Sequence, residues 1–117
     1  MVKKTDLEYL ISTTGNNREI IIELINIFIE QVGEFSEEFR NLYKMKDYDA
    51  LGKLAHKAKS SVAIMGMDKL TEKLKEFEIL ALKGIDHEKY PGFINYFIEE
   101  CDVAVKELYE YKDNIQQ

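Results

Sequence analysis

The chain has 117 residues, of which 45% are hydrophobic and 32% charged, as in soluble globular domains with a single core. Its formal net charge of −6 argues against general nucleic-acid binding, because contacts with phosphates require a basic surface. The one cysteine, Cys101, excludes an intrachain disulfide framework, and no signal peptide or apolar run of ~20 residues is present, so we expect a cytoplasmic protein that does not bind membranes.

Two helices are predicted in the first third of the chain. "TDLE", beginning at Thr5, has the pattern of a capping box, so a short first helix is expected from Thr5 to the turn "TTGNN". Asn16 and Glu19 form a second capping arrangement, and a long helix is expected from about Arg18. Gly33 is compatible with a bend or a break in this helix. The apolar residues of the long helix recur at helical spacing: Ile21, Leu24, Phe28, Phe35, Phe39 and Leu42.

Three further helices are predicted after a corner at "KMKDYD". The third is expected from about Tyr48 to Met65, with Gly66 as its C-terminal cap, and Asp68 is expected to cap the fourth. "KGIDHEKYPG" is predicted to be a loop, with Pro91 in the first turn of the last helix. The core stripe of the fourth helix is Leu70, Leu74, Phe77 and Ala81. That of the last helix is Ile94, Phe97, Cys101, Ala104 and Leu108.

The fold class that follows is all-α: an antiparallel four-helix bundle with an additional short N-terminal helix. The chain contains one proline and six glycines, which favours long helices over an architecture with many turns. No repeat, low-complexity tract or linker interrupts it, so residues 1–117 are expected to form a single domain.

From Ile20 to Ile29 the second helix is apolar nearly all round, with three residues outside its main stripe: Ile22, Ile25 and Ile29. One interpretation is burial against the first helix, because helices that are apolar on all sides are usually buried. The other is that part of this surface stays exposed and binds a partner. Both can hold, at different ends of the helix.

His56 is predicted to project from the third helix into solvent. On a helix that turns about 100° per residue, Lys53 and Lys59 flank His56 on either side. Three small residues lie on the same side as His56: Gly52, Ser60 and Ala63. The opposite side is expected to face the core and consists of Leu51, Leu54, Ala58 and Met65.

This arrangement permits phosphoryl transfer. A neutral imidazole has a free ring nitrogen that can attack phosphorus, and nearby lysines disfavour the protonated ring. Lys59, one turn from His56, can offset the negative charge of a phosphoryl group, and Lys53 can assist from the other side. Small neighbours would let another protein approach the ring. The alternative is an ordinary solvated helix face that happens to contain a histidine.

The segment from His56 to Gly66, "HKAKSSVAIMG", resembles the signature of histidine-containing phosphotransfer (HPt) domains. That signature is His, any residue, an apolar residue, Lys, Gly, two small residues, three further residues and Gly. His56 matches the phosphoacceptor, Lys59 the lysine and Gly66 the closing glycine, whereas Ser60 replaces the usual glycine. Three more positions match in character: Ala58, Ser61 and Val62. The resemblance covers nearly the whole chain and is weakest in the N-terminal helix.

The resemblance implies a phosphorelay intermediate. The phosphoryl group of a receiver-domain aspartate would pass to His56 and then to a second receiver, and both steps would be reversible. The receiver would supply Mg²⁺ and the aspartate, and the chain would need no cofactor of its own. In HPt domains the docking surface lies on the second and third helices. Here it would comprise Gly52, Lys53, Ser60, Ala63, Gly66, Ile22, Ile25 and Ile29.

Other functions fit the sequence less well. Autophosphorylation from ATP is not expected, because no Gly-rich phosphate-binding loop is present. A metal site is not expected either, because His87 lies in the predicted loop and no Cys/His/Asp/Glu set has ligand spacing. The alternative that remains is an adaptor that binds a receiver or kinase without carrying phosphate, and it would need neither His56 nor Lys59. We expect a monomer. The identity of the receivers, and whether the domain is free-standing or part of a hybrid kinase, stay open.

Overall fold

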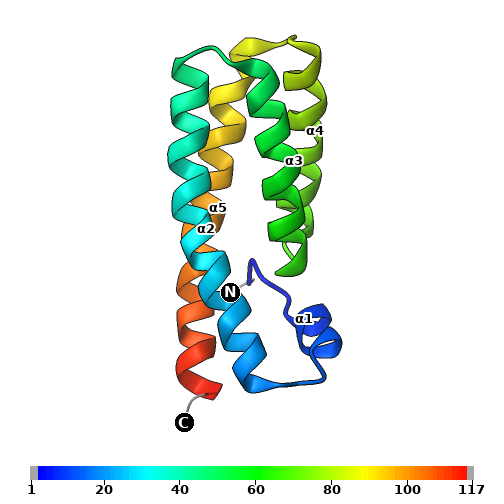
Figure 1. Cartoon of the computed structure of the whole chain (residues 1–117), viewed down its shortest axis with the longest axis vertical. Coiled ribbons are helices and arrows are strands. Elements are labelled where there is room, and N and C mark those ends of the chain that lie inside the picture. Colours follow the sequence, from blue (N-terminus) through cyan, green and yellow to red (C-terminus); the bar gives the residue numbers. More distant parts are fainter. Residues whose placement is uncertain (1–2, 116–117) are drawn as a thin grey trace.

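A computed structural model of the chain describes residues 3–115 and shows a bundle of long helices with a short helix at one end (Figure 1). The helices are α1 (Glu8–Thr13), α2 (Arg18–Lys44), α3 (Tyr48–Ile64), α4 (Asp68–Lys83) and α5 (Tyr90–Ile115), with a 3₁₀ turn, η1 (His87–Lys89), before α5. Helices α2 and α5 extend past the ends of α3 and α4, and α1 lies beyond the end of α3 (Figure 1). The predicted all-α bundle is confirmed. Between residues 3 and 115, no helix combines the length and the apolar character needed to cross a membrane.

The start of α1 differs from the predicted capping box. The helix begins at Glu8, and Asp6 Oδ1 accepts a hydrogen bond from the Glu8 amide at 3.1 Å. Thr5 does not cap the helix, because its amide and hydroxyl both donate to the carboxylate of Glu107 on α5, at 3.0 and 2.8 Å. Thr5, which the local sequence predicts to cap α1, therefore binds a distant helix instead.

Two other caps are shifted by one residue from their predicted positions. Asn17 caps α2, its side chain accepting from the Ile20 amide at 3.2 Å, because Asn16 has φ 59° and so lacks the extended backbone that an N-cap requires. Asp68 is the first residue of α4 and makes no capping bond, although its charge there complements the helix dipole. Helix α2 is not split at Gly33.

The core follows the predicted stripes closely. All predicted core residues of α4 and α5 are buried, and in α2 the residues Ile21, Phe28, Phe35 and Phe39 are buried while Leu24 and Leu42 are partly covered. Phe39 joins three helices, with its ring centroid 5.8 Å from that of Phe77 and 5.2 Å from that of Phe97. Each fully buried side chain of this size contributes roughly 1.5–3 kcal/mol through the hydrophobic effect.

Helices α3 and α4 approach each other closely at Gly52. This glycine is buried, and a Cβ atom at its position would lie 2.7 Å from Cγ and 3.0 Å from the backbone nitrogen of Leu82 on α4. No side chain larger than hydrogen fits there unless the Leu82 side chain or the backbone of α4 shifts. Gly52 is therefore a packing residue between helices, and its prediction as part of an exposed docking surface is wrong.

Gly66 ends α3 as predicted, with φ 70°, a left-handed conformation that glycine adopts at little cost. A Cβ atom at Gly66 would overlap the carbonyl group of Asp6. The Asp6 amide donates to the Met65 carbonyl oxygen at 3.0 Å. Gly66 thus gives the N-terminal segment room to lie against the end of α3, a role that differs from the predicted one in partner docking.

The predicted loop between α4 and α5 is more ordered than expected. His87 is exposed, as predicted, but it begins the 3₁₀ turn. Its ring centroid lies 4.0 Å from that of Tyr48, and its Nε2 lies 2.6 Å from the Gly84 carbonyl oxygen. These contacts connect His87 to the corner of the bundle.

Candidate functional site

His56 projects from α3 as the helical pattern predicts. The opposite face of the helix is buried, with Leu51, Leu54, Ala58 and Met65 all in the core. The side chain of His56 is 62% exposed. Because burial of the apolar stripe fixes the rotation of α3 in the bundle, it also holds the imidazole at the surface.

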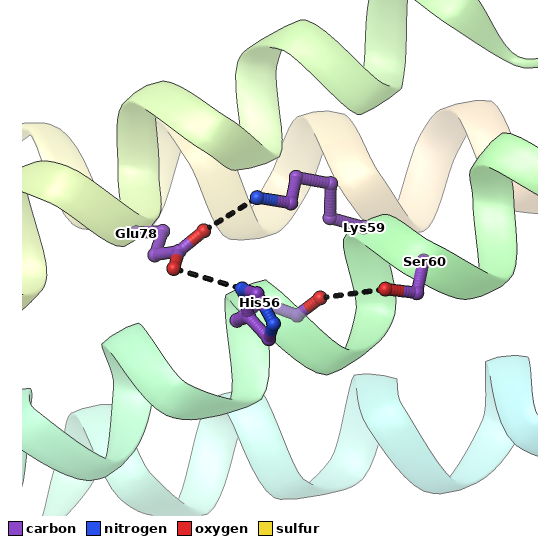
Figure 2. A network of polar contacts seen from close by, with 4 residues as sticks. All are labelled: His56, Lys59, Ser60 and Glu78. Carbon is purple, nitrogen blue, oxygen red and sulfur yellow. Dashed lines mark hydrogen bonds and ion pairs between the residues drawn. The ribbon is translucent and has the colours of Figure 1, made fainter.

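Helix α4 adds a carboxylate to this site that was not singled out in the sequence. Glu78 Oε2 lies 2.9 Å from His56 Nδ1, and Glu78 Oε1 lies 2.8 Å from Lys59 Nζ (Figure 2). A carboxylate only accepts hydrogen bonds, so Nδ1 carries the proton that is donated to Glu78. In the neutral ring, Nε2 then has the free lone pair. The contact therefore selects which ring nitrogen is available as a nucleophile.

Glu78 is ionised at neutral pH. The hydrogen bond from Lys59 is the main cause that lowers the pKa of Glu78, the hydrogen bond from His56 Nδ1–H adds to it, and partial burial opposes both. The side chains of Glu78 and Lys59 are 17% and 23% exposed. A largely covered ion pair thus lies beneath the exposed imidazole and holds Lys59 next to it.

Lys53 is not part of this network. Its Nζ lies 3.0 Å from Asp49 Oδ2 in a pair within α3, and both side chains are mostly exposed. Such surface pairs contribute little to stability. Of the two lysines predicted to assist His56, Lys59 is the one that shares a carboxylate with it.

The predicted small residues divide into two groups. Ser60 and Ala63 are exposed, and the Ser60 hydroxyl lies 3.5 Å from the His56 carbonyl oxygen (Figure 2), at the limit of a hydrogen bond. Because both side chains are small, they do not project far from the surface beside His56. Gly52 is buried against α4 and does not belong to this exposed surface, whereas Gly66 is half-buried and lines a depression together with Ala63.

The three isoleucines predicted for docking also differ from one another. Ile25 is fully buried, because it lies four residues after Ile21 and three before Phe28 and so belongs to the core stripe of α2. Its assignment to an exposed docking surface is wrong. Ile22 and Ile29 are half-buried. The exposed isoleucine of α2 that lies next to α3 is Ile27, which is 44% exposed.

Two shallow depressions meet at Ile64 near the end of α3. Between α2 and α3, one is lined by Ile27, Gln31, Ser61 and Ile64 among others, and the Ser61 hydroxyl donates to Gln31 Oε1 at 3.0 Å. The other lies between α1 and α3. It is lined by Asp6, Glu8, Tyr9, Ala63, Ile64, Gly66 and Asp68. We call the exposed surface formed by Tyr9, Ile27, Ser60, Ala63 and Ile64 the apolar face.

The sequence matches the Hpt domain family over residues 23–111, which include all of α3 and α4 and therefore His56, Lys59 and Glu78. The chain belongs to the Hpt domain family. Searches of curated proteins and of solved structures gave no significant match. Hpt domains act in histidine phosphotransfer in two-component signalling and interact with receiver domains. Helix α1 and the segment before it lie outside the matched range of this Hpt domain.

Glu78 could have been found from the short connection between α3 and α4. In an antiparallel helix pair, residues at similar distances from the turn face each other. His56 precedes Gly66 by 10 residues and Glu78 follows it by 12. In this Hpt domain, the turn at Gly66 thus sets the register that brings an acidic residue of α4 to the histidine. No group of three or more His, Cys, Asp or Glu residues in the described part of the chain could hold a metal ion.

Proposed function

We propose that this Hpt domain is a phosphorelay intermediate in which Nε2 of His56 accepts a phosphoryl group from a receiver-domain aspartate and passes it to the aspartate of another receiver. The observation that carries this proposal is the exposed imidazole whose Nδ1 is bound by Glu78 at 2.9 Å. Nε2 is left as the nucleophile, and it points away from the bond that holds the ring.

The transfer step follows from this geometry. The lone pair of Nε2 attacks phosphorus, the N–P bond forms, and the P–O bond to the aspartate breaks, with the electron pair leaving on the carboxylate. The Nδ1 proton stays on the ring, where Glu78 offsets the positive charge that develops. Lys59 Nζ, held 2.8 Å from the same carboxylate, offsets charge on the phosphoryl oxygens. Mg²⁺ would come from the receiver, and the reverse steps return the group to an aspartate.

The charge distribution also supports this function. Helix α3 carries three lysines against one aspartate, whereas α2 carries six glutamates against three basic residues and α5 six acidic residues against two lysines. The histidine thus sits on a basic helix of an acidic protein. A phosphorylated, negatively charged partner site would be directed to α3 by this distribution.

The apolar face is the proposed docking surface for the receiver. It lies on the exposed part of α3 that follows His56, and it continues onto α2 through Ile27 and onto α1 through Tyr9. Half-buried Ile22 and Ile29 lie about 140–160° around α2 from Ile27, on the side where Asn26 contacts Lys112 of α5, so they are not included in this surface. We also propose that the chain acts as a monomer, since one exposed histidine suffices for transfer, and in the cytoplasm, where receiver domains work.

The acceptor assignment can be tested with phosphoramidate, a small donor, and with a panel of phosphorylated receiver domains from the same genome. We expect the wild type to take up acid-labile, base-stable label from both donors. His56→Gln should lose all label while keeping its helical circular dichroism and melting temperature, and His87→Gln should keep the label. Label that persists in His56→Gln would refute the assignment. A wild type that binds a receiver but takes label from neither donor would be a non-catalytic adaptor.

Ala63→Tyr tests the docking surface separately from the chemistry. Ala63 is exposed on the apolar face, so a large ring there should leave the core intact and obstruct a protein that approaches His56. We expect receiver-dependent labelling to fall severely and labelling by phosphoramidate to stay unchanged. Equal loss with both donors would mean that the ring damages the site itself, and no loss with either would remove Ala63 from the docking surface.

A further inference from the structure

The N-terminal strap, residues 4–6, is tied to the last helix by one carboxylate. Glu107 of α5 accepts hydrogen bonds from the Lys4 amide at 2.8 Å, the Thr5 amide at 3.0 Å and the Thr5 hydroxyl at 2.8 Å. Lys4 Nζ also pairs with Glu100 of α5 at 3.2 Å. A single side chain therefore satisfies two backbone amides of a segment that has no secondary structure of its own.

The other end of the strap is bound to α3. The Asp6 amide donates to the Met65 carbonyl oxygen at 3.0 Å, and the absence of a side chain at Gly66 makes room for the Asp6 backbone. The strap therefore runs from α5 to the end of the helix that carries His56. Burial tends to raise the pKa of Glu107, but the hydrogen bonds from Lys4 and Thr5 outweigh it and lower that pKa. The bonds are thus made to an ionised carboxylate and are of the stronger kind.

The position of α1 depends on this strap. Helix α1 has six residues, too few to be stable alone, and Leu10 is its one buried residue. The strap leads directly into it. Helix α1 presents Tyr9, which is 62% exposed, in the depression that also contains Ala63 and Ile64. The helix that forms one wall of that depression therefore continues from a segment that is bound by Glu107 of α5 and by the end of α3.

We propose that Glu107 is a positioning residue for receiver docking, acting through the strap to hold α1 and Tyr9 at the edge of the apolar face. This inference rests on the proposed function and adds a determinant of partner affinity that touches neither His56 nor the phosphoryl group. Because Glu107 lies on α5 and its bonds go to residues 4 and 5, its effect on docking passes through the backbone of the strap. Removal of the carboxylate should release α1 without changing the His56 site.

The test compares Glu107→Ala with Glu107→Gln and Tyr9→Ala, with Glu110→Ala as a control on an exposed residue of the same helix. Four quantities are measured on the whole chain: amide hydrogen exchange of residues 4–15, labelling by phosphoramidate, and both KM and kcat for transfer from the receiver that labels the wild type best. Thr5→Ala, which removes only the hydroxyl bond, serves as a milder variant if Glu107→Ala fails to fold.

For Glu107→Ala we expect exchange of residues 4–15 to rise at least tenfold and KM for the receiver to rise about fivefold to tenfold, with kcat and phosphoramidate labelling unchanged. Tyr9→Ala should raise KM without changing exchange, and Glu107→Gln, which keeps an acceptor oxygen, should lie between wild type and Glu107→Ala. Unchanged exchange in Glu107→Ala, or faster exchange with an unchanged KM, would overturn the inference. A wild type that no receiver labels would refute the proposed function and the docking role with it, while exchange would still show whether Glu107 holds the strap.

Discussion

Two substitutions of Glu78 separate its role as hydrogen-bond acceptor for His56 from the effect of its negative charge. Glu78→Ala removes both the acceptor for Nδ1–H and the partner of Lys59, whereas Glu78→Gln keeps an amide oxygen that can accept from Nδ1–H and removes only the charge. Both variants leave the His56 side chain on the exposed face of α3. If the carboxylate selects the reactive nitrogen, Glu78→Ala should slow phosphoryl acceptance more than Glu78→Gln.

The size of the effect follows from the exposure of the partners. A hydrogen bond to a charged group contributes roughly 1.5–3 kcal/mol when it is well covered, and an ion pair between exposed groups about 0.2–1 kcal/mol. His56 is 62% exposed while Glu78 is 17% exposed, so their contact lies between these two cases. We therefore expect it to contribute about 1 kcal/mol of stabilisation. A loss of that size lowers the rate about fivefold. We therefore expect about fivefold slower labelling by phosphoramidate in Glu78→Ala and a smaller change in Glu78→Gln.

Two measurements check this expectation. The initial rate of labelling by phosphoramidate gives the effect on the chemistry without a docking partner. Nitrogen-15 chemical shifts of the His56 ring report which nitrogen carries the proton, and Nδ1 should carry it in the wild type and less often in Glu78→Ala. Glu76→Ala, on the solvent-exposed side of α4, is the matched control. A wild-type labelling rate in Glu78→Ala, with an unchanged proton distribution, would refute the proposed role of Glu78.

The remaining predictions concern the helices around the site. Lys59→Ala should slow transfer about tenfold by removing one charge-stabilising donor, measured as single-turnover transfer from a receiver, and an unchanged rate would remove Lys59 from the mechanism. Gly52→Ala should gain about 1 kcal/mol of stability from helix propensity but lose about 1–3 kcal/mol to overpacking against Leu82. Urea unfolding should therefore show a net loss of stability, which a second substitution, Leu82→Ala, should partly restore. The pKa values of Glu78 and Glu107 are both lowered by folding, so their stabilisation is present above about pH 4.5 and is lost as pH falls through the lowered values. The free energy of unfolding should decrease from pH 6 to pH 3, and it should decrease less in the variant that carries both Glu78→Gln and Glu107→Gln. An equal decrease in the two proteins would contradict the lowered pKa values of these two carboxylates.

The features that could be predicted from sequence are those that one helix determines by itself. The stripes of α4 and α5 and the exposure of His56 follow from the 3.6-residue period of apolar side chains, which does not depend on the neighbouring helix. The ends of α3 were predicted within one residue because Asp47, whose side chain accepts from the Ala50 amide at 3.2 Å, and Gly66 are local signals.

The features that were missed depend on two helices at once. Thr5 has a capping sequence, but Glu107, 102 residues away, competes for its donors. Leu24 and Ile25 both fit a helical period over a few turns, so the sequence pattern alone does not show which of the two enters the core. Only packing against the rest of the bundle decides between them: Ile25 is fully buried and Leu24 partly so.

Gly52 and Glu78 belong to the same helix–helix register. Gly52 precedes Gly66 by 14 residues and Leu82 follows it by 16, an offset of two residues that also relates His56 to Glu78. The close approach at Gly52 therefore lies one helical turn from the contact between His56 and Glu78. Because a glutamate side chain is short, a wider spacing of α3 and α4 would take its carboxylate out of reach of Nδ1. In the proposed mechanism, Gly52 would thus act from inside the bundle, by keeping α4 close enough for Glu78 to bind the ring.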